Sequence, residues 1–154
     1  MTMAFALLEQ HVASLGGIAG LDSRAPQLLE HAQLDELSAL LGAPLPASIR
    51  WWWSRFGCDI DFVQPVVYPD PYANEDTLLG WFLSAEEVRK TLDDYHGSLA
   101  PHRVPIINDG GDNFVVVDSD GSVYEHIHDA PLDRNTYRIA DSFEQFVLSW
   151  RRGD

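Results

Sequence analysis

The sequence contains a single cysteine, Cys58, among its 154 residues. An intramolecular disulfide and a cysteine-rich metal site are therefore excluded, and a reducing compartment is the simplest interpretation. Basic residues are also scarce, because 10 Lys and Arg stand against 24 Asp and Glu, which gives a formal net charge of -14. This charge would repel nucleic acid and anionic membrane surfaces, so neither is an expected partner.

Long apolar runs are missing as well. Segment 1–17 has no basic leader, and Glu9 interrupts its apolar residues early. We therefore expect neither a signal peptide nor a membrane-spanning helix, and we predict a cytoplasmic protein. The sequence contains no internal repeat, low-complexity tract or long linker, while 45% of its residues are hydrophobic and 11% aromatic. One domain with a packed core is the resulting expectation.

The acidic residues are concentrated in two stretches that contain no Lys or Arg. The first runs from Asp59 to Glu87 and the second from Asp109 to Asp133, and each holds seven acids. Because opposite charges speed the encounter of two proteins, this distribution favours a basic protein partner. The alternative is that the acidity serves solubility alone.

Apolar spacing and turn residues predict the secondary structure. In the first third of the chain we expect three helices, over 5–15, from near Pro26 to Leu41, and over 48–56. A strand over 60–68, an exposed acidic loop over 69–77, a strand over 78–83 and a helix opened by a capping box at 84–87 should follow. The rest of the chain should form strands over 104–107, 114–117 and 123–127 and a closing helix opened by a second capping box at 142–145. This order predicts an α+β fold, a single domain with a mostly antiparallel twisted sheet flanked by helices.

Five tryptophans stand out in the composition, and three of them are adjacent. At helical spacing, Trp52 and Trp53 point inward together with Ile49 and Phe56, whereas Trp51 lies off this stripe. We expect Trp51 to pack against the N-terminal helix, and a functional role for it is the alternative.

Three landmarks in the second and third quarters of the chain and near its end carry a resemblance to a known family. They are Leu40-Leu41-Gly42 with Leu45-Pro46 and Gly57, then Pro105-Ile106-Ile107 with Asp109-Gly110-Gly111-Asp112-Asn113, and finally Gly121-Ser122-Val123-Tyr124 with His128 and Ala140-Asp141-Ser142-Phe143-Glu144-Gln145-Phe146. In this order the chain resembles the SUKH superfamily from about Leu34 to Trp150. The tryptophan-rich helix and the acidic loop over 69–77 depart from that pattern.

Bacterial members of this superfamily are mostly immunity proteins of polymorphic toxin systems, and fungal members include regulators of cell-wall synthesis. The resemblance implies a SUKH-like domain over 21–154, with the helix in 1–20 as an addition packed on it. It also implies a binding scaffold without common catalytic residues and without a cofactor. Combined with the acidity, it predicts an immunity protein that neutralises a basic, nuclease-type toxin domain.

The expected contact surface combines the acidic loop, the strand before it and the turn in the third quarter of the chain. Its candidate residues are Asp59, Asp61, Asp70, Tyr72, Glu75, Asp76, Asp109 and Asp112, with Tyr72 as an aromatic anchor. A regulatory or scaffold protein of the same fold is the first alternative.

A metal-dependent hydrolase is the second alternative, because His126 and His128 alternate and would share one face of a strand. A histidine pair without a metal is the commoner situation, so we assign no metal ligand. Asp109-Gly110-Gly111-Asp112 is expected to be a turn in which both glycines take positive φ. Asp118-Ser119-Asp120-Gly121 is expected to be a hairpin turn, since residue 127, where a calcium loop needs glutamate, is Ile.

Nucleophilic catalysis has no support in the sequence. A Gly-x-Ser-x-Gly motif is absent, and Cys58 follows a predicted helix end, where the negative end of the helix dipole disfavours a thiolate. We therefore assign no catalytic residue.

Overall fold

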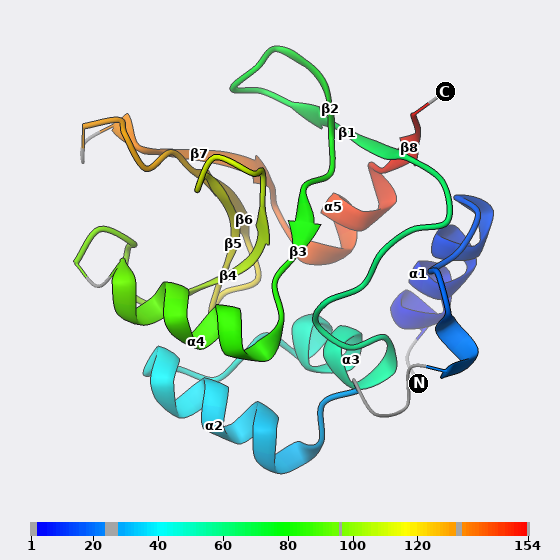
Figure 1. Ribbon diagram of the computed structural model, residues 1–154, viewed down its shortest axis with the longest axis horizontal. Helices are drawn as coiled ribbons and strands as arrows, with labels where there is room; N and C mark the ends of the chain where they lie inside the picture. Colours follow the sequence, from blue (N-terminus) through cyan, green and yellow to red (C-terminus); the bar gives the residue numbers. More distant parts are fainter. Residues whose placement is uncertain (1–2, 24–27, 96, 132–133, 154) are drawn as a thin grey trace.

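The computed structural model describes residues 3–23, 28–95, 97–131 and 134–153. Within these residues the chain forms five α-helices and two antiparallel sheets, the predicted single-domain α+β fold (Figure 1). The helices are α1 (Met3–Ser14), α2 (His31–Leu41), α3 (Ala47–Arg55), α4 (Ala85–Asp94) and α5 (Phe143–Leu148), and a 3-10 turn spans Leu21–Ser23. No helix of these described parts is long and apolar enough to cross a membrane.

The main sheet has five strands in the order β3-β4-β5-β6-β7, and a smaller sheet has the order β2-β1-β8. The main sheet consists of β3 (Trp81–Phe82), β4 (Arg103–Asn108), β5 (Phe114–Asp118), β6 (Val123–His126) and β7 (Thr136–Ala140), and the smaller sheet of β1 (Val66–Asp70), β2 (Glu75–Leu78) and β8 (Arg151–Arg152). The expected hairpin is β5–β6, paired from Phe114↔His126 to Val117↔Val123. Strands β7 and β8 were not predicted, and the single strand expected over 78–83 is divided between β2 and β3.

A side-chain cap fixes the start of α4. Ser84 Oγ accepts a hydrogen bond from the Glu87 amide (3.1 Å), and the Glu87 carboxylate accepts one from the Ser84 amide (3.0 Å), which is the predicted capping box. The predicted opening of the second helix near Pro26 falls in 24–27, outside the described residues. The helix α2 itself begins at His31, because Glu30 is its N-cap.

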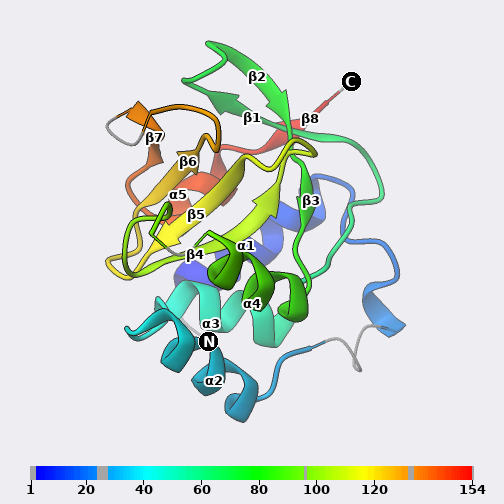
Figure 2. The same ribbon diagram turned by 60° about the vertical axis from the view of Figure 1, so that its left-hand side comes forward.

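Aromatic side chains form the centre of the core behind the main sheet. The ring of Trp52 on α3 lies 5.3 Å from that of Phe143 on α5 and 5.7 Å from that of Trp150, both edge to face. In Figure 2, α5 and α1 lie behind the main sheet, while α4 lies in front of its lower end. The inward stripe predicted for the third helix therefore packs directly against the closing helix.

The N-terminal helix packs on this core. Leu8 and Val12 of α1 are buried, and His11 Nε2 lies 2.9 Å from the carbonyl oxygen of Trp150. The ring of Phe5 stacks on Trp51, with centroids 4.8 Å apart and planes 9° apart. Trp51 thus makes the contact with the N-terminal helix that its position off the inward stripe predicted.

Candidate functional site

The segment that was predicted to be an exposed acidic loop forms the β1–β2 hairpin instead. Val67 pairs with Leu78 and Asp70 with Glu75, so the pairing extends through Pro69. The tip is closed by Asp70, whose carboxylate accepts hydrogen bonds from the amides of Tyr72 (2.9 Å) and Ala73 (3.4 Å). In both views the hairpin lies at the end of the molecule opposite α2 (Figures 1 and 2).

Asp70 was expected on the exposed contact surface, and this placement is wrong. Only 5% of the residue is exposed. Its second carboxylate oxygen accepts a hydrogen bond from Thr77 Oγ1 (3.2 Å) and lies 3.5 Å from the hydroxyl of Tyr68. Asp70 therefore holds the hairpin together from inside, because burying a carboxylate requires such partners.

A second acid, Glu125, is buried beside Asp70 where the two sheets meet. The Tyr68 hydroxyl donates a 2.8 Å hydrogen bond to Glu125 Oε1, and Oε2 is buried without a hydrogen-bond partner among the described residues. Burial, supported by the neighbouring Asp70 carboxyl, raises the pKa of Glu125 to about 8. Burial and the nearby Glu125 carboxyl also raise the pKa of Tyr68. Sequence reasoning missed this cluster, although the alternation of a strand places Asp70 on the buried face of Tyr68 and Glu125 on that of Val123.

The remaining candidates on the hairpin are exposed, but their charge is partly compensated. Asp76 forms an ion pair with Arg151 of β8. Glu75 and Asp76 line a hollow between the hairpin and β7 that Arg138 also lines. Tyr72 is 50% exposed, and its ring lies 4.9 Å from that of Tyr137. The hairpin therefore offers less free negative charge than its sequence indicated.

Asp59 and Asp61 are exposed, as a contact surface requires, but they do not lie on a strand. The segment between α3 and β1 is irregular, apart from an isolated bridge between Phe62 and Ile18. The Asp61 carbonyl accepts a hydrogen bond from the Ala19 amide (2.8 Å), so this segment pairs with the chain after α1. The prediction of a strand over 60–68 is thus wrong before Val66, because the partner segment offers only one bridge.

The Asp109–Asp112 segment is the turn between β4 and β5 that the sequence predicted. Asp109 Oδ1 accepts hydrogen bonds from the amides of Gly111 (2.7 Å) and Asn113 (3.2 Å), so the carboxylate organises the loop from within. Gly110 has the expected positive φ of 102°, but the second such residue is Asp112 (63°) and not Gly111. Asp109 and Asp112 both remain exposed.

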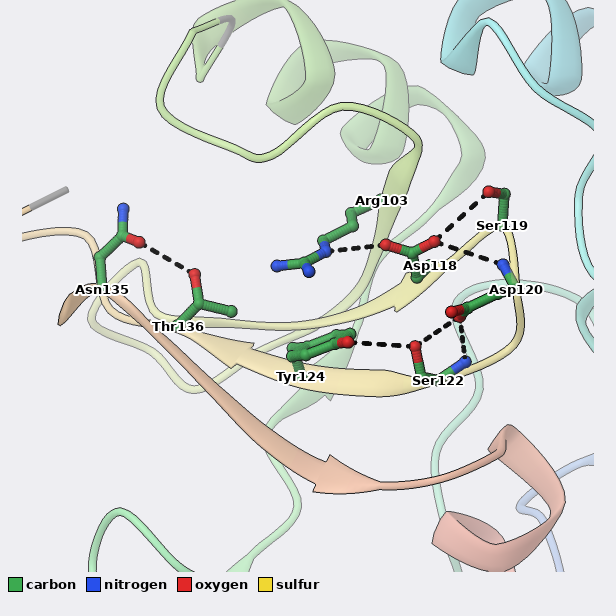
Figure 3. Close-up of polar contacts among 8 residues, drawn as sticks. All are labelled: Arg103, Asp118, Ser119, Asp120, Ser122, Tyr124, Asn135 and Thr136. Carbon is green, nitrogen blue, oxygen red and sulfur yellow. Dashed lines mark hydrogen bonds and ion pairs between the residues drawn. The ribbon is translucent and has the colours of Figure 1, made fainter. Parts of the chain in front are cut away.

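The Asp118–Gly121 segment is a hairpin turn held by its own side chains (Figure 3). Asp120 accepts hydrogen bonds from the amide and the hydroxyl of Ser122, and these bonds lower the pKa of Asp120. Asp118 pairs with Arg103 at 2.9 Å, and the Arg103 guanidinium lies 3.8 Å from the ring centre of Tyr124. The carboxylates of Asp118 and Asp120 therefore both stabilise the hairpin, as expected for residues of a turn.

The two histidines of the metal hypothesis do not share a strand face. Strand β6 ends at His126, which is buried, and His128 lies in the turn that follows and is exposed. His128 Nδ1 contacts Asn113 Oδ1 at 3.0 Å, while His126 Nε2 lies 3.4 Å from the Ser98 hydroxyl. Burial lowers the pKa of His126. Across the described ranges, no group of three or more His, Cys, Asp or Glu side chains could hold a metal ion.

One surface feature was missed entirely by sequence reasoning. Segment 60–66 and segment 78–82 line a groove of ≈350 Å³, in which Val63, Leu78 and Trp81 are more than half exposed. Asp61, already a candidate, lies in this groove. No sequence signal marked it, because the apolar run over 78–83 is typical of a strand, and only the fold brings segment 60–66 alongside.

Comparison with known families agrees with this architecture. A model of the SMI1 / KNR4 family (SUKH-1) matches residues 29–149. The match begins before α2 and ends after α5, so α1 lies outside it, as the sequence resemblance indicated. No curated protein matches the chain. Because the family model covers most of the chain and both sheets except β8, the protein belongs to the SMI1 / KNR4 family (SUKH-1).

Proposed function

We propose that this protein is an immunity protein that binds and neutralises a cognate bacterial toxin. Membership in the SUKH-1 family carries the proposal, because bacterial proteins of this superfamily are mostly immunity proteins. On this proposal the chain acts by binding and not by catalysis, and it works in the cytoplasm, where a toxin that attacks nucleic acid would act.

The charge of the chain supports a basic partner. Two stretches that contain no Lys or Arg, 59–87 and 109–133, supply most of its acids. The register Trp81↔Asn108 between β3 and β4 brings these stretches together, although Asp133 itself lies outside the described residues. A toxin domain that binds nucleic acid carries positive charge, so such a surface would attract it and compete with its substrate.

Co-expression tests this function directly. The toxin domain encoded next to this gene should arrest growth when expressed alone, and co-expression of this protein should restore growth and give a stoichiometric complex on size-exclusion chromatography. A toxin domain that remains toxic and elutes separately would contradict the proposal. A regulatory or scaffold protein of the same fold is the alternative, and it predicts no toxin gene beside this one.

A further inference from the structure

The groove between segments 60–66 and 78–82 is a concentration of exposed apolar side chains. Val63 and Leu78 are each 61% exposed and Trp81 is 53% exposed, and all three line the same groove. Exposed apolar patches often mark interaction sites, and tryptophan is among the residues enriched in binding hot spots.

The backbone of the groove is fixed on both sides. The Val63 amide donates a hydrogen bond to the Gly17 carbonyl (3.1 Å), and the Leu79 amide donates one to the Val66 carbonyl (2.9 Å). At Gly80 the chain passes so close to β4 that an added Cβ would lie 2.0 Å from the Asn108 carbonyl oxygen. A groove held in this way loses little conformational entropy when a ligand binds.

The floor of the groove belongs to the core. Phe62 and Phe82 line the groove, and their ring centroids are 6.2 Å apart. The Phe62 ring also lies 5.7 Å from that of Trp150, edge to face. The apolar surface of the groove is therefore continuous with the aromatic core around Trp150.

The charge around the groove differs between its two sides. Among the described residues that line it, Asp61 is the charged one, while the exposed Arg152 of β8 pairs with Val66 and so flanks one side. At the other side, a Cβ on Gly110 would lie 3.5 Å from the Trp81 ring, so Trp81 adjoins the loop that carries the exposed Asp109 and Asp112. A ligand that complements the Trp81 side of this surface combines an apolar group for the groove with positive charge toward Asp109 and Asp112.

We propose that the groove binds a segment of a partner protein in which an apolar side chain stands beside Lys or Arg. A second copy of this chain is a poor occupant, because it would bring the same acids against one another. The identification of the partner as the toxin domain rests on the proposed function, whereas the chemistry of the segment follows from the groove itself.

Selection from a random peptide library displayed on phage tests this inference with the intact protein. The selected peptides should share an apolar residue next to Lys or Arg, and a synthetic copy should reduce the acrylamide quenching of tryptophan fluorescence in the wild type but not in Trp81→Ala. Affinity should fall on the order of tenfold or more in Trp81→Ala and in the double variant Val63→Ser with Leu78→Ser. The matched control is Leu40→Ser, a 55% exposed leucine on α2 at the opposite end of the molecule, which should bind as the wild type does.

Failure to enrich any peptide, an acidic consensus, or equal binding to Trp81→Ala and the wild type would overturn the inference. Self-association of the chain that Trp81→Ala abolishes would overturn it in favour of a second copy. The link to the toxin has its own readout, because the selected peptide should compete with the toxin domain. If the toxin domain does not bind at all, the proposed function fails while the peptide selection still decides the chemistry of the groove.

Discussion

Glu125 and Asp70 place two carboxyl groups in the interior, on strands of different sheets. Two adjacent buried carboxylates would repel each other in a poorly polar medium, and the raised pKa of Glu125, about 8, relieves this repulsion by keeping one proton. Tyr68 donates to one oxygen of Glu125, and a proton on the carboxyl removes the negative charge that would otherwise face Asp70. At the scale of single residues, the junction of the two sheets thus depends on a protonated acid.

This arrangement predicts a pH-dependent stability. The pKa of Glu125 in the folded protein is above its ordinary value of 4.5, so the stabilising contribution is fully present below that value and is lost as pH rises through about 8. Within this window the free energy of unfolding should fall by up to about 1.4 kcal/mol per pH unit from this one group. Urea unfolding of the wild type and of Glu125→Gln over this pH range measures the effect, because glutamine keeps the hydrogen bonds without titrating.

The wild type should lose stability relative to Glu125→Gln as pH rises. Glu86→Gln, which alters an exposed carboxyl in the first turn of α4, serves as the control and should follow the wild type. If the curves of wild type and Glu125→Gln stay parallel between pH 4.5 and 8, the buried proton is not there.

At the scale of elements, local signals were sufficient for helices and insufficient for the hairpin. The sequence marked Ser84 and Ser142 as the starts of α4 and α5, because a cap depends on residues only three positions apart. Ser84 forms the full capping box, whereas Ser142 forms only the N-cap hydrogen bond with the Gln145 amide.

Pro69 has no amide hydrogen to donate and so argued against a strand at this position. In the structure β8 pairs only with Val66 and Val67, which leaves one side of β1 unpaired at Pro69. An edge strand of this kind tolerates the missing amide hydrogen. Whether a segment such as 66–70 forms a strand depends on its pairing with distant segments, and the local sequence does not contain that information.

The N-terminal helix lies outside the family match but is part of the core, which gives an element-scale prediction. Leu8 of α1 is fully buried, whereas its neighbour Leu7 is 48% exposed. Leu8→Ala should lower the free energy of unfolding by about 2–4 kcal/mol, because it leaves a cavity against α5. Chemical denaturation measures the difference, and Leu7→Ala should change stability by no more than about 0.5 kcal/mol. Equal effects of the two changes would mean that α1 does not pack as described.

At the scale of the whole molecule, the sequence predicted the sign of the charge but not its distribution in space. Of the three acids expected to dominate the hairpin, Asp70 is buried and Asp76 is paired with Arg151. Asp61 instead lies in an apolar groove, which exists because segment 60–66 runs beside segment 78–82. Counting charges therefore predicted the net charge, whereas finding which acids are exposed required the fold.

We propose that an acidic surface around this groove captures a basic toxin domain. Association kinetics test this proposal most directly. We predict that the association rate of the toxin domain with the wild type falls steeply as salt increases, since screening removes electrostatic steering. Asp61→Lys should slow association and weaken its salt dependence. Asp93→Lys, which makes the same change in charge at an exposed position on α4, should have a much smaller effect. An association rate that is independent of salt, or that responds equally to both substitutions, would contradict the account.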